Sequence, residues 1–235
     1  MIELTEIFKN SLNLIFSLNL DLLEIILLSL KISFFSLLFS CIFGLPLGSL
    51  LAASKFFGRG FLILFFNSML GLPPVFVGLV LYIILSVSGP LGSLQLLYTP
   101  VAMIIAQFCL ITPIIVSLTR QVIEQITEEY DELLKSLQAS TRERIITILW
   151  DSRYSLLTCI LAGLGRSLSE VGAIIIVGGN IAHATRVMTT AIALETSKGN
   201  LEIAVALGFI LIFISIFINL LVFILTEFAK KASYD

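Results

Sequence analysis

Five apolar runs, each long enough to cross a lipid bilayer as a helix, dominate this sequence. They cover residues 23–53, 61–87, 100–118, 155–179 and 201–228. About 20 apolar residues in a helix cross a hydrocarbon core of about 30 Å. Hydrophobic residues make up 58% of the chain and charged residues 13%, far from the balance of a soluble domain. The sequence therefore predicts an all-α membrane protein with about five transmembrane helices.

The distribution of lysine and arginine predicts how the chain is oriented. With five spans, one side of the membrane receives Lys55, Arg59, Arg120, Lys135, Arg142, Arg144, Arg153, Lys230 and Lys231. The other side receives Lys9, Arg186 and Lys198. Because basic residues concentrate on the cytoplasmic side, we expect the N-terminus outside and the C-terminus in the cytoplasm.

Residues 1–20 alternate polar and apolar side chains at helical spacing. This pattern is typical of an amphipathic helix that lies on a membrane surface. A sixth span is the alternative. We therefore expect an amphipathic N-terminal segment, followed by a single transmembrane domain over residues 21–235.

Residues 120–153, between the third and fourth runs, hold much of the charge of the chain. At helical spacing, this segment has an apolar stripe that consists of Leu133, Leu134 and Leu137. Mostly acidic residues lie on the other faces of the predicted helix. Ser140 and Glu143 have the spacing of a capping box, which marks a second helix start. The pattern predicts a helix, a sharp turn and a helix. Since the first half is acidic, we expect a partner protein rather than anionic lipid to cover the stripe.

The run Glu132-Leu133-Leu134 with Leu137-Gln138-Ala139-Ser140 resembles the EAA loop of ABC-importer permeases. That loop reads Glu-Ala-Ala, three residues and Gly, with a later Ile-x-Leu-Pro. Here leucines replace the alanines, Gln138 replaces the glycine, and Trp150 and Asp151 replace the Leu-Pro pair. The resemblance implies docking in a groove of a separate ATPase through Glu132, Leu133, Leu134, Leu137, Gln138, Ala139 and Ser140.

Two further stretches resemble the permeases of oxyanion importers, most closely those of the tungstate type, with molybdate and sulfate permeases next. They run Gly71-Leu-Pro-Pro-Val-Phe-Val-Gly78 and Gly165-Arg-Ser-Leu-Ser-Glu-Val-Gly-Ala173. The resemblance implies a type I ABC-importer permease in the plasma membrane of a bacterium or archaeon. It also implies a second copy of the chain, two ATP-binding cassette subunits that hold ATP and Mg, and an external solute-binding protein that delivers the oxyanion.

Arg166 and Glu170 lie four residues apart in the fourth run, so we expect them on one face of one helix. An unpaired arginine within the bilayer costs about 2.5–3.5 kcal/mol on insertion scales, so the two side chains must pair or face water. One interpretation is a structural ion pair. A second is that Arg166 faces the translocation path and helps a dianion through, while Glu170 tempers its charge. A third is contact with a neighbouring subunit.

Pro73 and Pro74 interrupt the second run. Each proline removes a backbone donor and clashes with the preceding turn, at about 3 kcal/mol inside a helix, so we expect a break. Irregular backbone at membrane depth is tolerated where it is packed in protein or lines a watery cavity. The break therefore indicates a translocation path or gate, with a kink that only shapes packing as the alternative.

Several functions lack their motifs in this sequence. There is no GxxxxGK[ST] run, so we expect no P-loop, no enzymatic activity and no cofactor in this chain. No Cys/His cluster has metal-ligand spacing, and His183 is expected to be a solvated surface histidine. A net charge of −2 without a basic run argues against nucleic acid. An ion-coupled secondary transporter and a structural membrane subunit without a path are the rival functions.

Overall fold

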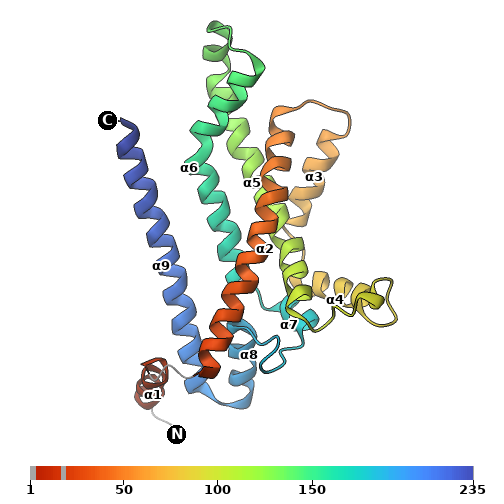
Figure 1. The fold of residues 1–235 in the computed structure, drawn as a ribbon, viewed down its shortest axis with the longest axis vertical. Coiled ribbons are helices and arrows are strands. Elements are labelled where there is room, and N and C mark those ends of the chain that lie inside the picture. The colour runs from red at the N-terminus through yellow and green to blue at the C-terminus, as the bar shows by residue number, and fades with distance from the viewer. Residues whose placement is uncertain (1–3, 17–19, 235) are drawn as a thin grey trace. The chain divides into compact units, whose positions relative to one another are not determined.

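The computed structural model describes residues 4–16 and 20–234, and nearly all of them are helical (Figure 1). In chain order the elements are α1 (Leu4–Phe16), α2 (Leu20–Ala53), α3 (Arg59–Met69), α4 (Pro74–Leu85), η1 (Gly92–Leu94), α5 (Pro100–Ser136), α6 (Thr141–Leu168), α7 (Gly172–Gly178), α8 (Met188–Lys198) and α9 (Leu201–Tyr234). No strand occurs within the two described ranges. The predicted all-α fold is confirmed, and the sidedness of the termini stays a prediction.

Four of the described helices, α2, α5, α6 and α9, are long and apolar enough to cross a bilayer. The helices α3 and α4 qualify only as a pair, and the pair makes a fifth span if it is counted as one. Residues 70–73 separate them. Pro74 is the first residue of α4, where a proline sacrifices no helical hydrogen bond. The predicted break is therefore confirmed. The predicted count of about five spans agrees with four long helices plus the α3–α4 pair.

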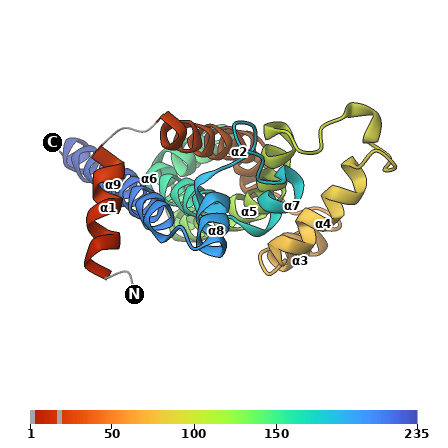
Figure 2. The same cartoon turned by 90° about the horizontal axis from the view of Figure 1, so that it is seen from below.

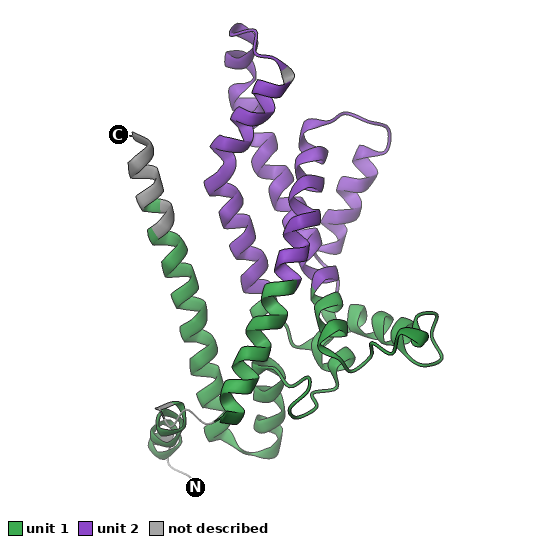
Figure 3. Ribbon diagram, in the orientation of Figure 1, with its two compact units in different colours: residues 1–35, 74–107, 167–235 green, residues 36–73, 108–166 purple. Residues whose placement is uncertain are grey.

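The chain divides into two compact units (Figure 3). Unit 1 contains residues 1–35, 74–107 and 167–235, and unit 2 contains residues 36–73 and 108–166. The boundaries fall inside α2, α5 and α6, so these helices belong to both units. The single domain expected over residues 21–235 stays a prediction.

Glycines set the helix packing of unit 2. A Cβ atom added at Gly44 would lie 2.8 Å from Ile115 Cγ2, and one at Gly48 would lie 2.7 Å from the carbonyl oxygen of Val116. Gly163 of α6 meets Ile115 equally closely, at 2.8 Å from Cδ1. Small residues let membrane helices approach backbone to backbone. The three glycines therefore allow α2, α5 and α6 to pack without a gap.

Unit 1 has its core around α8 and the first turns of α9. Its buried centre, which apolar side chains of α1, α2, α8 and α9 cover, consists of Leu22, Met188, Ala191 and Leu207. The helix α1 lies across the start of α9 (Figure 2). There Ser11 Oγ donates a hydrogen bond to the carbonyl of Glu202 (2.8 Å), and the rings of Phe8 and Phe209 meet. The α1 helix is thus tied to α9 by both polar and apolar contacts.

The fourth run differs from its prediction at both ends. We expected a span over residues 155–179, but α6 begins at Thr141 and ends at Leu168, and α7 begins only at Gly172. Glu170 therefore lies in the break, and the prediction that it shares a helix face with Arg166 is wrong. Two hydrogen bonds fix the irregular backbone: Thr189 Oγ1 donates to the Glu170 carbonyl (2.8 Å), and Glu170 Oε1 accepts from the N–H of Ala173 (3.1 Å).

The N-terminal segment is a helix over Leu4–Phe16, as its pattern predicts. Residues 1–3 and 17–19 of the predicted segment 1–20 lie outside the described residues. A location on the membrane surface stays a prediction.

Candidate functional site

A tight turn joins α5 to α6 and forms the predicted helix–turn–helix, which we call the charged hairpin (residues 120–153). The N–H of Ala139 donates to the carbonyl of Leu134, and the N–H of Gln138 donates to that of Lys135, both at 3.0 Å. This pair of bonds is the Schellman motif, which needs a left-handed residue after the helix. Gln138 occupies that position with φ 52°. The resemblance has glycine there, and this chain makes the same kind of turn with glutamine.

A capping box starts α6, as the sequence predicts. The carboxylate of Glu143 accepts hydrogen bonds from the backbone N–H (2.8 Å) and the hydroxyl (2.6 Å) of Ser140. In return the N–H of Glu143 donates to Ser140 Oγ at 3.4 Å. These bonds satisfy backbone donors that a helix start leaves open. The local sequence therefore defines the turn from both sides.

The two helices of the charged hairpin also pack on each other. Leu134 is 6% exposed and clusters with Ile123 of α5 and Ile148 of α6. Asp131 of α5 accepts a hydrogen bond from Arg144 of α6 (2.8 Å) and one from Lys135 (2.6 Å). A buried apolar core and an ion pair between the helices hold the hairpin together without a partner.

This packing divides the predicted apolar stripe. Leu134 contributes to the hairpin's own core, whereas Leu133 and Leu137 are 52% and 67% exposed. Glu132, Gln138 and Ser140 are exposed beside them, and Ala139 is half-buried. Further exposed apolar side chains on α6 are Ile145, Ile146, Leu149 and Trp150. The surface left for a partner thus consists of the turn and one side of α6, and docking there stays a prediction.

An open groove lies beside these side chains in unit 2. It encloses about 600 Å³ between the end of α2, the middle of α5 and the start of α6. Its wall is mostly apolar and includes Pro46, Leu50, Ile123, Ile145, Ile148 and Leu149, with Arg144 at one side. An apolar hollow next to exposed apolar side chains is typical of a surface that contacts lipid or protein.

Pro73 is the last residue of the break between α3 and α4, and Pro74 is the first residue of α4. Three tight turns close the end of α3, with backbone bonds from Leu70, Gly71 and Leu72 to the third residue before each. Pro73 is exposed and Pro74 is half-buried. Pro73 therefore lies in irregular backbone and Pro74 begins α4, and a role of the two prolines in a path or gate stays a prediction.

Arg166 and Glu170 belong to different segments of the chain, Arg166 to α6 and Glu170 to the break after it. Arg166 is half-buried in the last turn of α6. Glu170 is 3% exposed, and its carboxylate lies at the start of α7, where it accepts the N–H of Ala173. A carboxylate is favourable at a helix start because the free N–H groups there carry partial positive charge. Their part in a translocation path stays a prediction.

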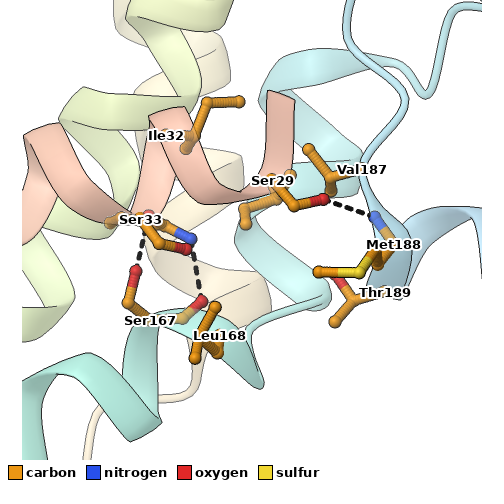
Figure 4. A pocket seen from close by; sticks show the side chains of 10 residues that line it. Ser29, Ile32, Ser33, Ser167, Leu168, Val187, Met188 and Thr189 are labelled. Carbon is orange, nitrogen blue, oxygen red and sulfur yellow. Dashed lines mark hydrogen bonds between the residues drawn. The ribbon is translucent and has the colours of Figure 1, made fainter. Parts of the chain in front are cut away.

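A polar cluster that the sequence analysis did not identify lies in unit 1 (Figure 4). Its side chains line a cavity of about 10 Å³ and come from α2, α5, the end of α6 and the start of α8: Ser29, Ser33, Gln107, Ser167 and Thr189. A signal for it was present in the sequence. Ser29, Ser33, Ser36 and Ser40 recur at helical spacing in the first apolar run. Such a stripe marks one polar face of an otherwise apolar span.

Metal-ligating side chains do not gather in groups of three or more anywhere in the described part of the chain. His183, expected to be solvated, is exposed but forms an ion pair with Glu24, with 2.7 Å between Nδ1 and Oε2. This contact raises the pKa of His183, mainly through the hydrogen bond to Glu24.

Comparison with known proteins places the chain in a family. Residues 44–231 match the family model described as "binding-protein-dependent transport system inner membrane component". A tungstate uptake system permease protein, TupB, of Peptoclostridium acidaminophilum is 38% identical over 95% of this chain and 98% of its own. A probable anion ABC transporter permease protein of Haloferax volcanii is 36% identical over 85% and 88%. The sulfate transport system permease protein CysT of Salmonella typhimurium is 26% identical over 78% and 69%.

The family match extends over most of the chain, from the middle of α2 into α9, and includes the break at the prolines and the charged hairpin. Together with the apolar helices it makes the protein a multi-pass integral membrane protein of the plasma membrane and a transport subunit. The chain belongs to the family of binding-protein-dependent transport system inner membrane components.

Proposed function

We propose that this chain is the permease subunit of an ABC importer that passes tungstate into the cytoplasm. An external binding protein delivers the oxyanion, and ATP hydrolysis on a separate subunit drives its passage. The observation that carries the proposal is the charged hairpin, a self-supporting helical turn that keeps Leu133 and Leu137 exposed. Exposed leucines at the end of a helix are suited to an apolar groove in a partner protein.

The rest of the complex follows from what this chain lacks. It has no P-loop motif, so ATP and Mg bind to two partner ATP-binding cassette subunits. A second copy of the chain completes the membrane part. The hairpins then face the ATPases in the cytoplasm, the C-terminus is cytoplasmic, and the N-terminus and the loop around His183 face outward.

The substrate assignment rests on similarity. The chain is 38% identical to the tungstate permease of Peptoclostridium acidaminophilum and 26% identical to the sulfate permease of Salmonella typhimurium. Tungstate is therefore the substrate we propose, and molybdate and sulfate are the alternatives of the same class. Since the binding protein selects the ion before it reaches the permease, the substrate has to be measured on the complete system.

Reconstituted uptake tests the proposal. The permease is placed in lipid vesicles with its ATPase and binding protein, and tungstate accumulation is measured with and without ATP. Uptake that needs all three proteins and ATP is expected. Uptake by the permease alone under an ion gradient would identify a secondary transporter instead, and no uptake under either condition would identify a structural subunit.

Competition in the same vesicles tests the substrate. Molybdate, sulfate and phosphate are added in excess over labelled tungstate. We expect strong competition from molybdate, a tetrahedral dianion of nearly the same size as tungstate, and little from the smaller sulfate and phosphate ions. Preferred uptake of sulfate or phosphate would overturn the substrate while leaving the permease function intact.

A further inference from the structure

A larger pocket of unit 1, which we call the outer pocket, lies where α1, the first turns of α2, the helix α8 and the start of α9 meet (Figure 1). Its volume is about 170 Å³. One water molecule needs about 10–15 Å³ of such space, so the pocket has room for a much larger ligand. Both α2 and α9 begin on the side of the membrane that we expect to face outward. We therefore expect the pocket at the outer surface of the bilayer.

Arg186, in the loop before α8, lines the outer pocket with a guanidinium group whose donors are largely unused. Its Nε atom is buried and has no hydrogen-bond partner among the described residues. Its Nη2 atom donates to the carbonyl of Asn180 across 3.5 Å, at the long end of the hydrogen-bond range. Buried polar groups nearly always have a partner, and the arginine fork matches the oxygens of a phosphate or carboxylate. The guanidinium group therefore indicates an anionic ligand.

Two carboxylates also line the outer pocket, and they differ in their partners. Glu195 is 7% exposed and accepts hydrogen bonds from Lys198 (2.9 Å) and Asn200 (2.7 Å), so the end of its own helix neutralises it. Asp21 is exposed and lies in the first turn of α2. The pocket therefore offers a cation, Arg186, and an exposed carboxylate, Asp21, to one ligand. A ligand that carries both an anion and a cation matches this pair.

The other side chains of the lining are all apolar, and two of them, Ile203 and Leu207, belong to α9. Ile210 and Ile214 continue the same face of α9 at helical spacing. Ile203, Ile210 and Ile214 are half-buried, so this face is partly open beyond the pocket. From Ile203 to Ile214 it is about 16 Å long, close to one half of a hydrocarbon core about 30 Å thick. An apolar face of this length suits the acyl chain of a lipid in one leaflet.

We propose that the outer pocket binds one molecule of an aminophospholipid, phosphatidylethanolamine. Its phosphodiester accepts hydrogen bonds from Arg186, its primary ammonium lies beside Asp21, and one acyl chain follows the apolar face of α9. Charge-assisted bonds of this kind, from arginine to phosphate and from ammonium to carboxylate, are the strong ones in proteins. The inference does not depend on which ion the permease carries.

The charges of the outer pocket select among the membrane lipids. Phosphatidylglycerol has no cation to place beside Asp21, and the quaternary ammonium of phosphatidylcholine has no N–H to donate. Inorganic phosphate would bind Arg186 but would leave the apolar lining uncovered, without the stabilisation that burial of an acyl chain provides. Among these ligands, phosphatidylethanolamine matches the cation, the carboxylate and the apolar face together.

Native mass spectrometry of the full chain tests the site. The protein is purified in detergent, freed of bound lipid and titrated with phosphatidylethanolamine, phosphatidylglycerol or phosphatidylcholine of identical acyl chains. We expect one tightly bound phosphatidylethanolamine per chain and about fivefold weaker binding of the other two lipids. Arg186→Gln should weaken the binding of phosphatidylethanolamine about tenfold or more, because it removes a hydrogen bond between charged groups. Arg142→Gln makes the same change at an exposed arginine of α6 and should bind as the wild type does.

Asp21→Asn tests the headgroup at an exposed position, where the replacement leaves the core untouched. This variant should lose the preference for phosphatidylethanolamine over phosphatidylglycerol while it still binds both through Arg186. Glycerophosphoethanolamine, the same headgroup without acyl chains, and inorganic phosphate separate a lipid from a soluble phosphate. Both should bind at least about a hundredfold more weakly than the lipid, because they bury no acyl chain. Binding as tight as that of the lipid would make the ligand a soluble phosphate and overturn the lipid site.

Photo-cross-linking locates the bound lipid without a substitution in the pocket. Phosphatidylethanolamine with a diazirine in one acyl chain is irradiated on the wild-type chain, and mass spectrometry maps the labelled peptides. We expect labels on α9 between Ile203 and Ile214, and unlabelled phosphatidylethanolamine in excess should remove them. Labels spread evenly over the apolar helices, or a folded Arg186→Gln variant that binds the lipid as the wild type does, would overturn the site. If Arg186→Gln does not fold, an unchanged headgroup preference in Asp21→Asn overturns it instead.

Discussion

Gln138 holds a left-handed backbone, with φ 52°, at the turn of the charged hairpin. A side chain costs about 1–2 kcal/mol in this conformation, and glycine avoids that cost while losing more freedom on folding. We therefore predict that Gln138→Gly stabilises the hairpin by about 0.5–1 kcal/mol. Hydrogen exchange of the hairpin amides measures the change. The control Gln121→Gly, in the helical part of α5, should destabilise by about 1 kcal/mol, and changes of the same sign would contradict the prediction.

His183 is the single histidine of the chain and reports on the loop before α8. Its pKa is raised above 6.5, first by the hydrogen bond to Glu24 and further by the charge of Asp21, whereas Arg186 opposes the shift. The protonated form is therefore favoured in the folded state. The stabilisation is complete below pH 6.5 and is lost as the pH rises through the higher folded pKa.

We predict that an NMR titration of His183 gives a pKa above 6.5 and that Glu24→Gln moves it back toward this value. Protection of the amides in the loop 179–187, corrected for the base-catalysed rise of exchange with pH, should fall as His183 is deprotonated. A titration that Glu24→Gln leaves unchanged would show that the ion pair is not formed in solution.

At the scale of the helices, the contact of α2 with α5 depends on Gly48. A Cβ there would lie 2.7 Å from the Val116 carbonyl oxygen and 2.8 Å from Thr119 Cβ, so backbone would have to move. We predict that Gly48→Ala destabilises the permease by about 1–3 kcal/mol, as overpacking does. A lower melting temperature in detergent measures the loss. Gly60→Ala in α3 has open space around it and should stabilise by up to about 1 kcal/mol.

The sequence predicts those elements whose determinants are local. Hydropathy identifies α2, α5 and α9, the prolines identify the break after α3, and the spacing of Ser140 and Glu143 identifies the start of α6. The break between α6 and α7 escapes prediction because its determinant is distant in sequence. Thr189, nineteen positions along the chain, bonds the carbonyl of Glu170. The pattern of residues within the run 155–179 therefore cannot reveal this contact.

The candidate site follows the same division. The turn at Gln138 and its cap are local and are predicted, but the burial of Leu134 is not, because it depends on Ile148 of the next helix. The polar cluster depends on Gln107 and Ser167, which are sixty residues apart. The serine stripe of α2 indicates a polar face, but only the structure shows which side chains of other helices lie against it.

On the scale of the whole molecule, much apolar surface needs cover. Only 6% of the residues in the 18-residue apolar stretch of α9 are buried within the chain, compared with 61% in the corresponding stretch of α5. The uncovered side chains of α9 include Ile212, Phe213, Ile216, Phe217 and Leu220. Lipid or a second copy of the chain must cover this face, since exposed apolar area of this extent is unstable in water. α5 is thus an inner helix of the fold, and α9 is an outer one.

Leu133 and Leu137, the two exposed leucines of the charged hairpin, are the side chains through which we expect the permease to bind its ATPase. Leu137 is 67% exposed and touches no core, so Leu137→Asp should leave the fold intact but place a charge in the docking surface. We predict that it weakens ATPase binding by about tenfold or more, a loss typical of a central interface residue. Co-purification and surface plasmon resonance measure the affinity, and the melting temperature of the permease alone should not change.

Leu94→Asp, at an exposed leucine of η1, is the matched control and should bind the ATPase normally. Leu134→Asp, in contrast, should lower the melting temperature itself because it buries a charge in the hairpin core. If Leu137→Asp binds the ATPase as tightly as the wild type, the charged hairpin is not the contact that couples the permease to its ATPase.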